Sequence, residues 1–333
     1  MELATNYMGL ALRNPLIASP SPLSRTVEGV RRLADAGVGA VVLYSLFEEQ
    51  LRHEAALNAQ LTDAGTESFA ESLSYFPTEA ETEPGPRRFL SLLERAAATV
   101  EVPVIASLNG VTPGVLHRAR VVGPAAAIEL NIYYLPGDLQ ISGRDVEQRH
   151  IDVLARVKDA VSVPVAVKLG PYFSSTGEMA LALDAAGADG LVLFNRLLQP
   201  DIDPDTLTVV PAVELSNAAE GRLARTWIAL LHGRVRASLA ATTGVEEPAD
   251  VARYLLAGAD VVMTTSALLR HGPEYAAVLL EGLRAWIERK GFTSVDELRG
   301  MLSVAPSTDE TEHARAGYVS ALREANSSTY GPW

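Results

Sequence analysis

The segment Leu183-Asp-Ala-Ala-Gly-Ala-Asp-Gly-Leu-Val-Leu193 carries the pattern that decides the fold. It contains the last turn of a helix, a glycine suited to a left-handed helix end, and a short strand of apolar residues. The chain repeats this junction twice more, as Leu33-Ala-Asp-Ala-Gly-Val-Gly-Ala-Val-Val-Leu43 and Leu255-Leu-Ala-Gly-Ala-Asp-Val-Val-Met263. The corresponding glycines are Gly37, Gly187 and Gly258.

Two further segments begin buried strands with a proline, Val102-Pro-Val-Ile-Ala-Ser-Leu108 and Val163-Pro-Val-Ala-Val-Lys-Leu169. Together the patterns predict eight strands that alternate with helices, at Pro15–Ala18, Ala40–Leu43, Pro103–Leu108, Ala127–Asn131, Pro164–Lys168, Gly190–Phe194, Arg236–Ala240 and Asp260–Thr264. This order favours an α/β protein with a single (β/α)₈ TIM barrel. A doubly wound sheet is the alternative, but its GxGxxG turn after the first strand is absent.

Long loops follow strands 2 and 6, at Ser45–Pro86 and Leu197–Gly221. Both would lie on the catalytic face of a barrel, where such loops are usually lids or substrate walls. We expect the first loop to contain a helix around Leu46–Leu61. We also expect residues 1–305 to form the barrel and residues 306–333 to form a C-terminal helix and tail, packed on the barrel or extending from it.

Composition limits the partners and the chemistry. The formal net charge is −13, and no Lys/Arg run suggests a nucleic-acid or anionic-membrane partner. The sequence has neither an apolar run near the roughly 18 residues of a membrane span nor a signal-peptide pattern, so we expect a cytoplasmic protein. With 0 cysteines, the chain can form neither disulfides nor iron–sulfur clusters, and any redox chemistry needs a bound cofactor.

Polar residues follow the predicted strands, and Lys168 is the most informative of them. It ends the apolar run Val-Ala-Val-Lys, and a buried ammonium is costly unless it is paired. Lys168 could therefore be a Schiff-base nucleophile, a cation that holds an anionic ligand, or a structural partner of a carboxylate.

The last two strands lead into Ala240-Ala-Thr-Thr-Gly-Val245 and Thr264-Thr-Ser-Ala-Leu268. Small residues with free backbone N–H groups at these positions are typical of a barrel phosphate site, although they also suit tight turns. Glu48, Glu49 and His53 have helical spacing close to that of a metal site, but we interpret them as a solvated helix face and expect no metal.

Several motifs together resemble the dihydroorotate dehydrogenase family, and most of all its dihydroorotate dehydrogenase-like subgroup. They are Leu12-Arg-Asn-Pro-Leu-Ile-Ala-Ser19, Glu129-Leu-Asn131, Val167-Lys-Leu-Gly-Pro-Tyr-Phe173, Phe194-Asn195, Ala241-Thr-Thr-Gly-Val245, Ser266-Ala-Leu-Leu269, Gly272-Pro273 and Gly291-Phe-Thr-Ser-Val-Asp-Glu-Leu-Arg299. The resemblance extends from about Leu12 to Leu302. It implies a barrel that binds FMN, an oxidoreductase of pyrimidine metabolism acting on CH–CH groups, and a homodimer.

The resemblance also implies site residues. Lys168 would face the flavin as a cation, and the other cofactor residues would be Ala18, Ser19, Ser45, Thr243, Gly244, Thr265 and Ser266. The family has glycines in place of Thr243 and Thr265, so we expect their backbone N–H groups to remain usable only if φ stays negative. The substrate residues would be Asn131, Asn195, Arg196 and Tyr44.

The chain departs from the family at the catalytic base. The family's Cys or Ser is replaced in Asn131-Ile-Tyr-Tyr-Leu-Pro136, and Tyr44 stands where the family ends strand 2 with lysine. Oxidation of dihydroorotate itself is therefore doubtful. A phenol, with a reference pKa near about 10, suits proton donation, so Tyr134 or Tyr133 could act as the acid in reduction of an activated C=C bond. Alternatively, the two rings fill the site and make it inert.

The leading hypothesis is a flavin-dependent oxidoreductase acting on a small cyclic or carbonyl-conjugated substrate, with catalytic residues Tyr134, Tyr133 and Lys168. Its electrons would pass to an unidentified acceptor or partner redox protein. The alternatives are a lyase or aldolase that uses Lys168 on a phosphorylated substrate, and a flavoprotein subunit without catalysis.

Overall fold

The computed structural model describes residues 2–47, 85–110, 125–196, 200–210, 214–305, 307 and 310–328. Eight parallel strands close into a barrel in these ranges, because β4 pairs with β3 on one side and with β6 on the other. The barrel strands are β3 (Leu16–Ala18), β4 (Ala40–Val42), β6 (Val104–Asn109), β7 (Ala127–Asn131), β8 (Val165–Leu169), β9 (Gly190–Leu193), β12 (Ser238–Ala241) and β13 (Val261–Thr264). The predicted TIM barrel is confirmed, and the open doubly wound alternative is excluded.

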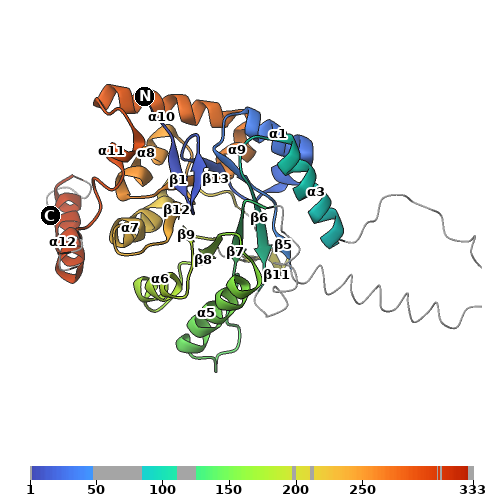
Figure 1. The fold of residues 1–333 in the computed structure, drawn as a ribbon. Helices are drawn as coiled ribbons and strands as arrows, with labels where there is room; N and C mark the ends of the chain where they lie inside the picture. Colours follow the sequence, from blue (N-terminus) through green and yellow to red (C-terminus); the bar gives the residue numbers. More distant parts are fainter. Residues whose placement is uncertain are drawn as a thin grey trace, which may run out of the picture.

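Helices surround the strands as an outer ring (Figure 1). They are α1 (Val27–Asp35), α3 (Gly85–Thr99), α5 (Gly143–Ala160), α6 (Thr176–Ala185), α7 (Gly221–Leu231), α8 (Pro248–Ala257) and α10 (Tyr275–Lys290), with the shorter η1 (Pro22–Ser24), η3 (Ala218–Glu220), α9 (Ser266–His271) and α11 (Val295–Leu298). No helix in the described ranges has both the length and the apolar character needed to span a membrane.

The repeated junction has the predicted geometry. Gly37, Gly187 and Gly258 have φ values of 105°, 92° and 116°, a region that L side chains rarely adopt. Each glycine lies between the end of a helix and the start of a barrel strand, so the repeated sequence pattern does correspond to a repeated structural unit.

The apolar side chains form two layers, as the alternation of residues along a strand requires. One layer lies between strands and helices and includes Leu16, Val41 and Leu191. The other lies inside the barrel and includes Ile17, Val42, Val192 and Met263. The barrel interior is therefore packed, and ligands must bind at its mouth.

A hairpin of β1 (Thr5–Tyr7) and β2 (Leu10–Leu12) closes the amino-terminal end of the barrel. Tyr7 and Met8 pack with the interior layer, and the Met8 backbone N–H donates to the Ser238 hydroxyl at 3.0 Å. A methyl group added at Gly190 would approach the Met8 side chain to 3.1 Å, so the absence of a side chain there makes room for the hairpin.

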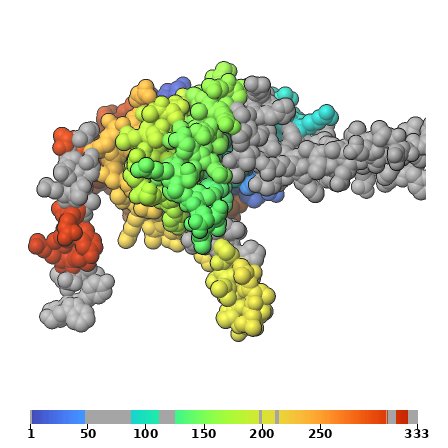
Figure 2. All heavy atoms as spheres, turned by 90° about the horizontal axis from the view of Figure 1, so that it is seen from below, coloured from blue at the N-terminus to red at the C-terminus, as the bar shows by residue number. Residues whose placement is uncertain are grey.

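The two long loops differ from expectation. Leu46–Phe47 forms β5, which pairs with β6, so the helix predicted from Leu46 is wrong at its start, and the rest of it lies outside the described residues. Glu48, Glu49 and His53, the residues with spacing close to that of a metal site, also lie outside the described residues. The second loop contains a hairpin of β10 (Asp201–Asp203) and β11 (Thr208–Val210), which projects from the body of the molecule (Figure 2).

The C-terminal helix α12 (Glu310–Ser328) stands apart from the helical ring (Figure 1). Its described side chains, at positions 315–324, are all exposed. This exposure agrees with a helix that extends from the barrel, while the division at residue 305 stays a prediction.

Candidate functional site

Lys168 forms a buried ion pair with Glu129. Nζ lies 3.2 Å from Glu129 Oε1, and the two side chains are 9% and 1% exposed. Glu129 lies two residues before Asn131 on β7, so both side chains point into the barrel, and the strand register places Asn131 beside Lys168. The carboxylate partner was only one of three possibilities at the sequence level. An ammonium held by a carboxylate is not the free amine that imine formation requires, which weakens the aldolase alternative.

Below this pair lies the hydroxyl of Tyr7, from the hairpin that closes the barrel. Burial raises the pKa of Tyr7 well above its ordinary value, with smaller contributions from the negative charges of Glu129 and Asp260. The Tyr7 hydroxyl and Glu129 Oε2 are both buried without a hydrogen-bond partner among the described residues. The charge of Glu129 thus affects the buried Tyr7 phenol, although no hydrogen bond joins the two groups.

The predicted substrate amides lie together at the mouth. Asn195 Nδ2 donates to Asn131 Oδ1 at 3.0 Å. Arg196 is engaged elsewhere: its Nε donates to Glu220 Oε1 at 3.0 Å, and its Nη1 donates to the Glu214 carbonyl. The structure therefore brings the two asparagines together, whereas Arg196 holds the segment that precedes α7.

Tyr44 and Ser45 face different parts of the molecule. Ser45 Oγ lies 2.8 Å from Ser107 Oγ, which belongs to the barrel interior. The Tyr44 ring packs edge-on against Phe89 of α3, with 5.4 Å between ring centroids. Tyr44 therefore packs against the layer between strands and helices, and its contact with substrate stays a prediction.

Tyr133 and Tyr134 are half-buried in the loop after β7. The Arg149 guanidinium lies over the Tyr134 ring, 4.3 Å from its centroid. Both tyrosines line a pocket of about 250 Å³, and Asn195 lines the same pocket. Lys168 and Asn131 are not among its lining residues, so the pocket lies beside the barrel mouth.

The predicted phosphate loop after β12 has an unexpected backbone conformation. Thr243 has a φ of +78° and Gly244 a φ of +69°, so the condition of a negative φ is not met at Thr243. The Thr243 hydroxyl donates to the Phe194 carbonyl at 3.0 Å, and the Tyr254 hydroxyl donates to the Thr243 carbonyl at 2.6 Å. Burial raises the pKa of Tyr254, which keeps its hydroxyl a donor. These bonds offset the strain of a threonine in a glycine conformation.

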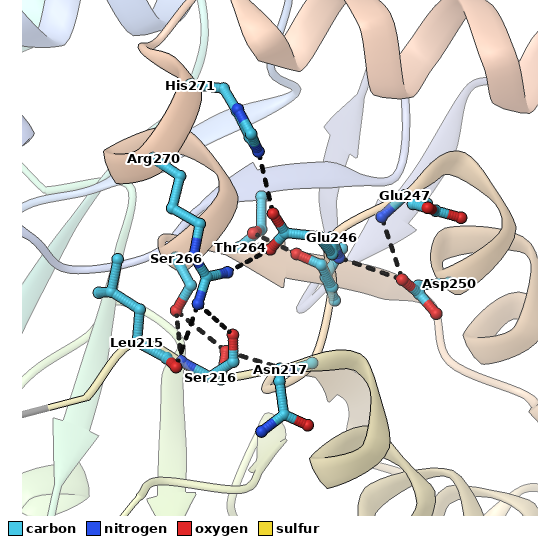
Figure 3. Close-up of polar contacts among 12 residues, drawn as sticks. Leu215, Ser216, Asn217, Glu246, Glu247, Asp250, Thr264, Ser266, Arg270 and His271 are labelled. Atoms are coloured by element: carbon cyan, nitrogen blue, oxygen red, sulfur yellow. Dashed lines mark hydrogen bonds and ion pairs between the residues drawn. The ribbon is translucent and has the colours of Figure 1, made fainter.

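Ser216, which the sequence did not single out, lies in the same cradle (Figure 3). Its hydroxyl donates to Ser266 Oγ at 2.9 Å and accepts from the Gly244 N–H at 3.3 Å. Arg270 donates to the carbonyls of Leu215 and Ser216 and pairs with Glu246 at 2.5 Å. Ser216 thus occupies the Gly244 N–H and the Ser266 hydroxyl, two groups that could otherwise donate to a phosphate. The only sequence signal for it was its position in the long loop after strand 6.

A flavin phosphate and ring are compatible with the remaining groups. The Ser19 hydroxyl at the carboxyl end of β3 is buried and has no partner in the described structure, while its backbone N–H donates to Thr264 and its carbonyl accepts from Thr265 Oγ1. A buried hydroxyl that lacks a protein partner suits a hydrogen bond to a bound polar group. In the described ranges, no three His, Asp or Glu side chains are arranged to hold a metal ion.

No family model matches the chain. It is 30% identical over 311 residues to the catalytic subunit of dihydroorotate dehydrogenase B (NAD⁺) of Methanothermobacter thermautotrophicus, covering 90% of this chain and 98% of that protein. The corresponding protein of Pyrococcus furiosus is 27% identical over 312 residues, covering 90% and 99%. A putative dihydroorotate dehydrogenase A (fumarate) of Aeropyrum pernix is 30% identical over 226 residues, covering 65% and 73%. The chain therefore belongs to the dihydroorotate dehydrogenase family of oxidoreductases.

Proposed function

We propose that this protein is an FMN-dependent oxidoreductase that acts on the CH–CH or C=C bond of a small cyclic or carbonyl-conjugated substrate. The observation that carries the proposal is the buried Lys168 ammonium beside the Asn131–Asn195 pair, at the barrel end where catalytic residues lie. The names of the relatives, which are dihydroorotate dehydrogenases, support the reaction class.

The cofactor would be held by residues from four strand ends. Ala18 and Ser19 would lie beside the ring, Lys168 would supply a cation, and Gly244 and Ser266 would bind the phosphate together with the backbone of Thr265, whose φ is negative. Bound FMN supplies the exchange of a hydride with the substrate carbon. The Ser216 hydroxyl already forms hydrogen bonds with the Gly244 N–H and the Ser266 hydroxyl. When a phosphate binds, these two groups must bond either to both Ser216 and the phosphate or to the phosphate alone.

Tyr134, or Tyr133, would donate the proton that completes reduction of a C=C bond. A neutral phenol has a hydrogen to give, and both rings line the pocket that Asn195 also reaches. Asn131 and Asn195 would orient the substrate, because each amide retains groups beyond their mutual hydrogen bond. Dihydroorotate is a doubtful substrate, since Cys or Ser is absent from the position of the base.

Electrons would pass to a separate acceptor or partner redox protein, because the chain has 0 cysteines to hold an iron–sulfur cluster. The relatives are named catalytic subunits, which supports a partner. We further propose a homodimer in the cytoplasm.

The absorption spectrum of the purified protein tests the cofactor. We expect flavin bands that are released on denaturation and identified as FMN by chromatography. Lys168→Met should weaken FMN binding, whereas Glu281→Gln, an exposed change on α10, should not. A colourless protein that does not bind added FMN would refute the proposal.

The roles of the tyrosines require turnover measurements. Single variants Tyr133→Phe and Tyr134→Phe keep the ring volume and remove the hydroxyl. If one tyrosine is the acid, its variant should lower kcat by about 10²-fold or more while FMN binding is unchanged. Equal turnover in both variants would eliminate the acid role, and bound flavin that no tested dihydropyrimidine, quinone or nicotinamide reduces would favour a subunit without catalysis.

A further inference from the structure

The pocket beside the barrel mouth is formed by α5 and by the loops after β7 and β8. Gly143, Val146, Glu147 and His150 line it from α5, and their spacing of three, four and seven residues places them on one face of the helix. A capping box between Ser142 and Asp145 fixes the first turn of this helix. The pocket wall is therefore built on a regular helix.

The size and the walls of the pocket suit one ring with a short arm. A dry cavity of roughly 150 Å³ is sufficient for benzene, and this pocket measures about 250 Å³. Tyr133, Tyr134, Tyr172 and Phe173 all contribute to its lining. Aromatic walls of this kind favour a flat, unsaturated ligand.

The charge of the pocket disfavours an anionic ligand. Among its described lining residues, Glu147 is the one with a carboxylate, and none is a lysine or arginine. Glu147 Oε1 accepts from Ser174 Oγ at 3.1 Å. Burial lowers the pKa of His150, whose Nδ1 lies 2.7 Å from the Val146 carbonyl, so its ring is neutral near pH 7. The nearby Arg149 guanidinium lies over the Tyr134 ring.

We propose that this pocket binds the uncharged aryl end of an aryl-substituted α,β-unsaturated carbonyl compound. Asn195 belongs both to the pocket and to the asparagine pair at the mouth, so a ligand extending from the pocket can bring its carbonyl to the Asn195 amide. The substrate class rests on the proposed reductive function, while the choice of an uncharged aryl group rests on the pocket itself.

A matched pair of ligands tests the charge argument. The 4-carbamoyl and 4-carboxy derivatives of trans-cinnamamide have the same ring and C=C bond and differ in the charge of the aryl end, which the pocket holds. In calorimetric titrations of the flavin-loaded protein above pH 7, we expect the carbamoyl compound to bind roughly tenfold more tightly, as one charge repulsion at a partly exposed site allows. Glu147→Gln should reduce this preference to about threefold or less. Equal binding of the two ligands by the unaltered protein, or no binding of cinnamamide, would overturn the proposal.

Two substitutions test the location. Val146→Phe should fill the pocket and weaken cinnamamide binding by about tenfold or more, whereas the exposed control Glu281→Gln should leave it unchanged. Tyr172→Ala provides a second test that spares the core, because this ring is 64% exposed, and it should weaken binding by about threefold or more. Unchanged affinity in either a folded Val146→Phe or Tyr172→Ala protein would place the ligand elsewhere and refute the proposal.

A turnover experiment separates this inference from the proposed function. Under anaerobic conditions, 4-phenyl-3-buten-2-one should reoxidise the reduced flavoprotein, with a hydride added to its β-carbon and a proton to its α-carbon. Pocket-dependent binding without reoxidation would support the pocket and count against the reductase. Reoxidation by small enones that Val146→Phe does not affect, together with absent cinnamamide binding, would count against the pocket alone.

Discussion

At the residue scale, the proposed function rests most on Lys168, whose positive charge is balanced by a buried partner. The sequence indicated a lysine among apolar neighbours, but the structure identifies Glu129 as the group that balances its charge. Glu129 is the more deeply buried of the two, and one of its oxygens has no hydrogen-bond partner in the described structure. The pair is therefore costly to maintain, as is common for groups kept for function rather than for stability.

Breaking the pair should be strongly destabilising. Lys168→Met should lower the free energy of unfolding by about 3–5 kcal/mol, because it leaves a buried carboxylate uncompensated. The double variant Lys168→Met/Glu129→Met should be much closer to the wild-type protein. Urea unfolding measures the free energies of the two single variants, of the double variant and of the exposed control Glu281→Gln. Additive effects of the two single substitutions would contradict coupling across the pair.

His150 should make stability depend on pH. Burial lowers its pKa in the folded protein, so the unfolded chain binds a proton first as the pH falls below about 6.5. The stabilisation from neutral His150 is thus present above about pH 6.5 and is lost as the pH falls through the lowered folded pKa. Unfolding free energies at pH 7.5, 6.5 and 5.5 should decline less steeply for His150→Gln than for the wild-type protein. Parallel pH curves would show that His150 does not contribute.

At the scale of the elements, the carboxyl-terminal ends of helices depend on glycine for two separable reasons. Gly258 ends α8 with a φ of +116°, and an added methyl group there would come within 2.4 Å of the His232 ring. Gly291 ends α10 with a φ of +82°, yet a methyl group there would meet nothing within 4 Å. One site combines backbone strain with a steric clash, and the other has the strain alone.

This contrast provides a matched experiment. Gly291→Ala should cost about 1–2 kcal/mol from the left-handed conformation. Gly258→Ala should cost about 3 kcal/mol or more, because the His232 ring must also move. Chemical denaturation measures the difference between the two variants. Equal losses in the free energy of unfolding would mean that the His232 ring moves aside without an energetic penalty.

At the scale of the whole molecule, barrel closure brings together residues that are far apart in the chain. Ser19, Lys168 and Asn195 come from different strand ends, and the amino-terminal hairpin brings Tyr7 beneath them. The C-terminal helix takes no visible part in this arrangement, since the side chains described at 315–324 are exposed.

Truncation tests whether the barrel is complete without that helix. A chain ending at Ser307 keeps the carbonyls of Val304 and Ala305, which accept hydrogen bonds from Arg234. We expect its free energy of unfolding to stay within about 0.5 kcal/mol of the full chain, as for changes at exposed positions. A markedly less stable product would contradict the predicted boundary at residue 305.

The sequence by itself determined the barrel and the order of its strands, and it placed Lys168, Asn131 and Asn195 at the ends of strands. These follow from local patterns: glycines at helix ends, apolar runs, and polar residues after strands. The Thr243 backbone, the outward packing of Tyr44, and the roles of Glu129, Ser216 and Tyr254 were decided only by the tertiary structure. Each depends on a contact between segments distant in the chain, such as Glu129 with Lys168 or Ser216 with Ser266. Periodicity reports which face of an element is buried, but it carries no information about the group that lies opposite.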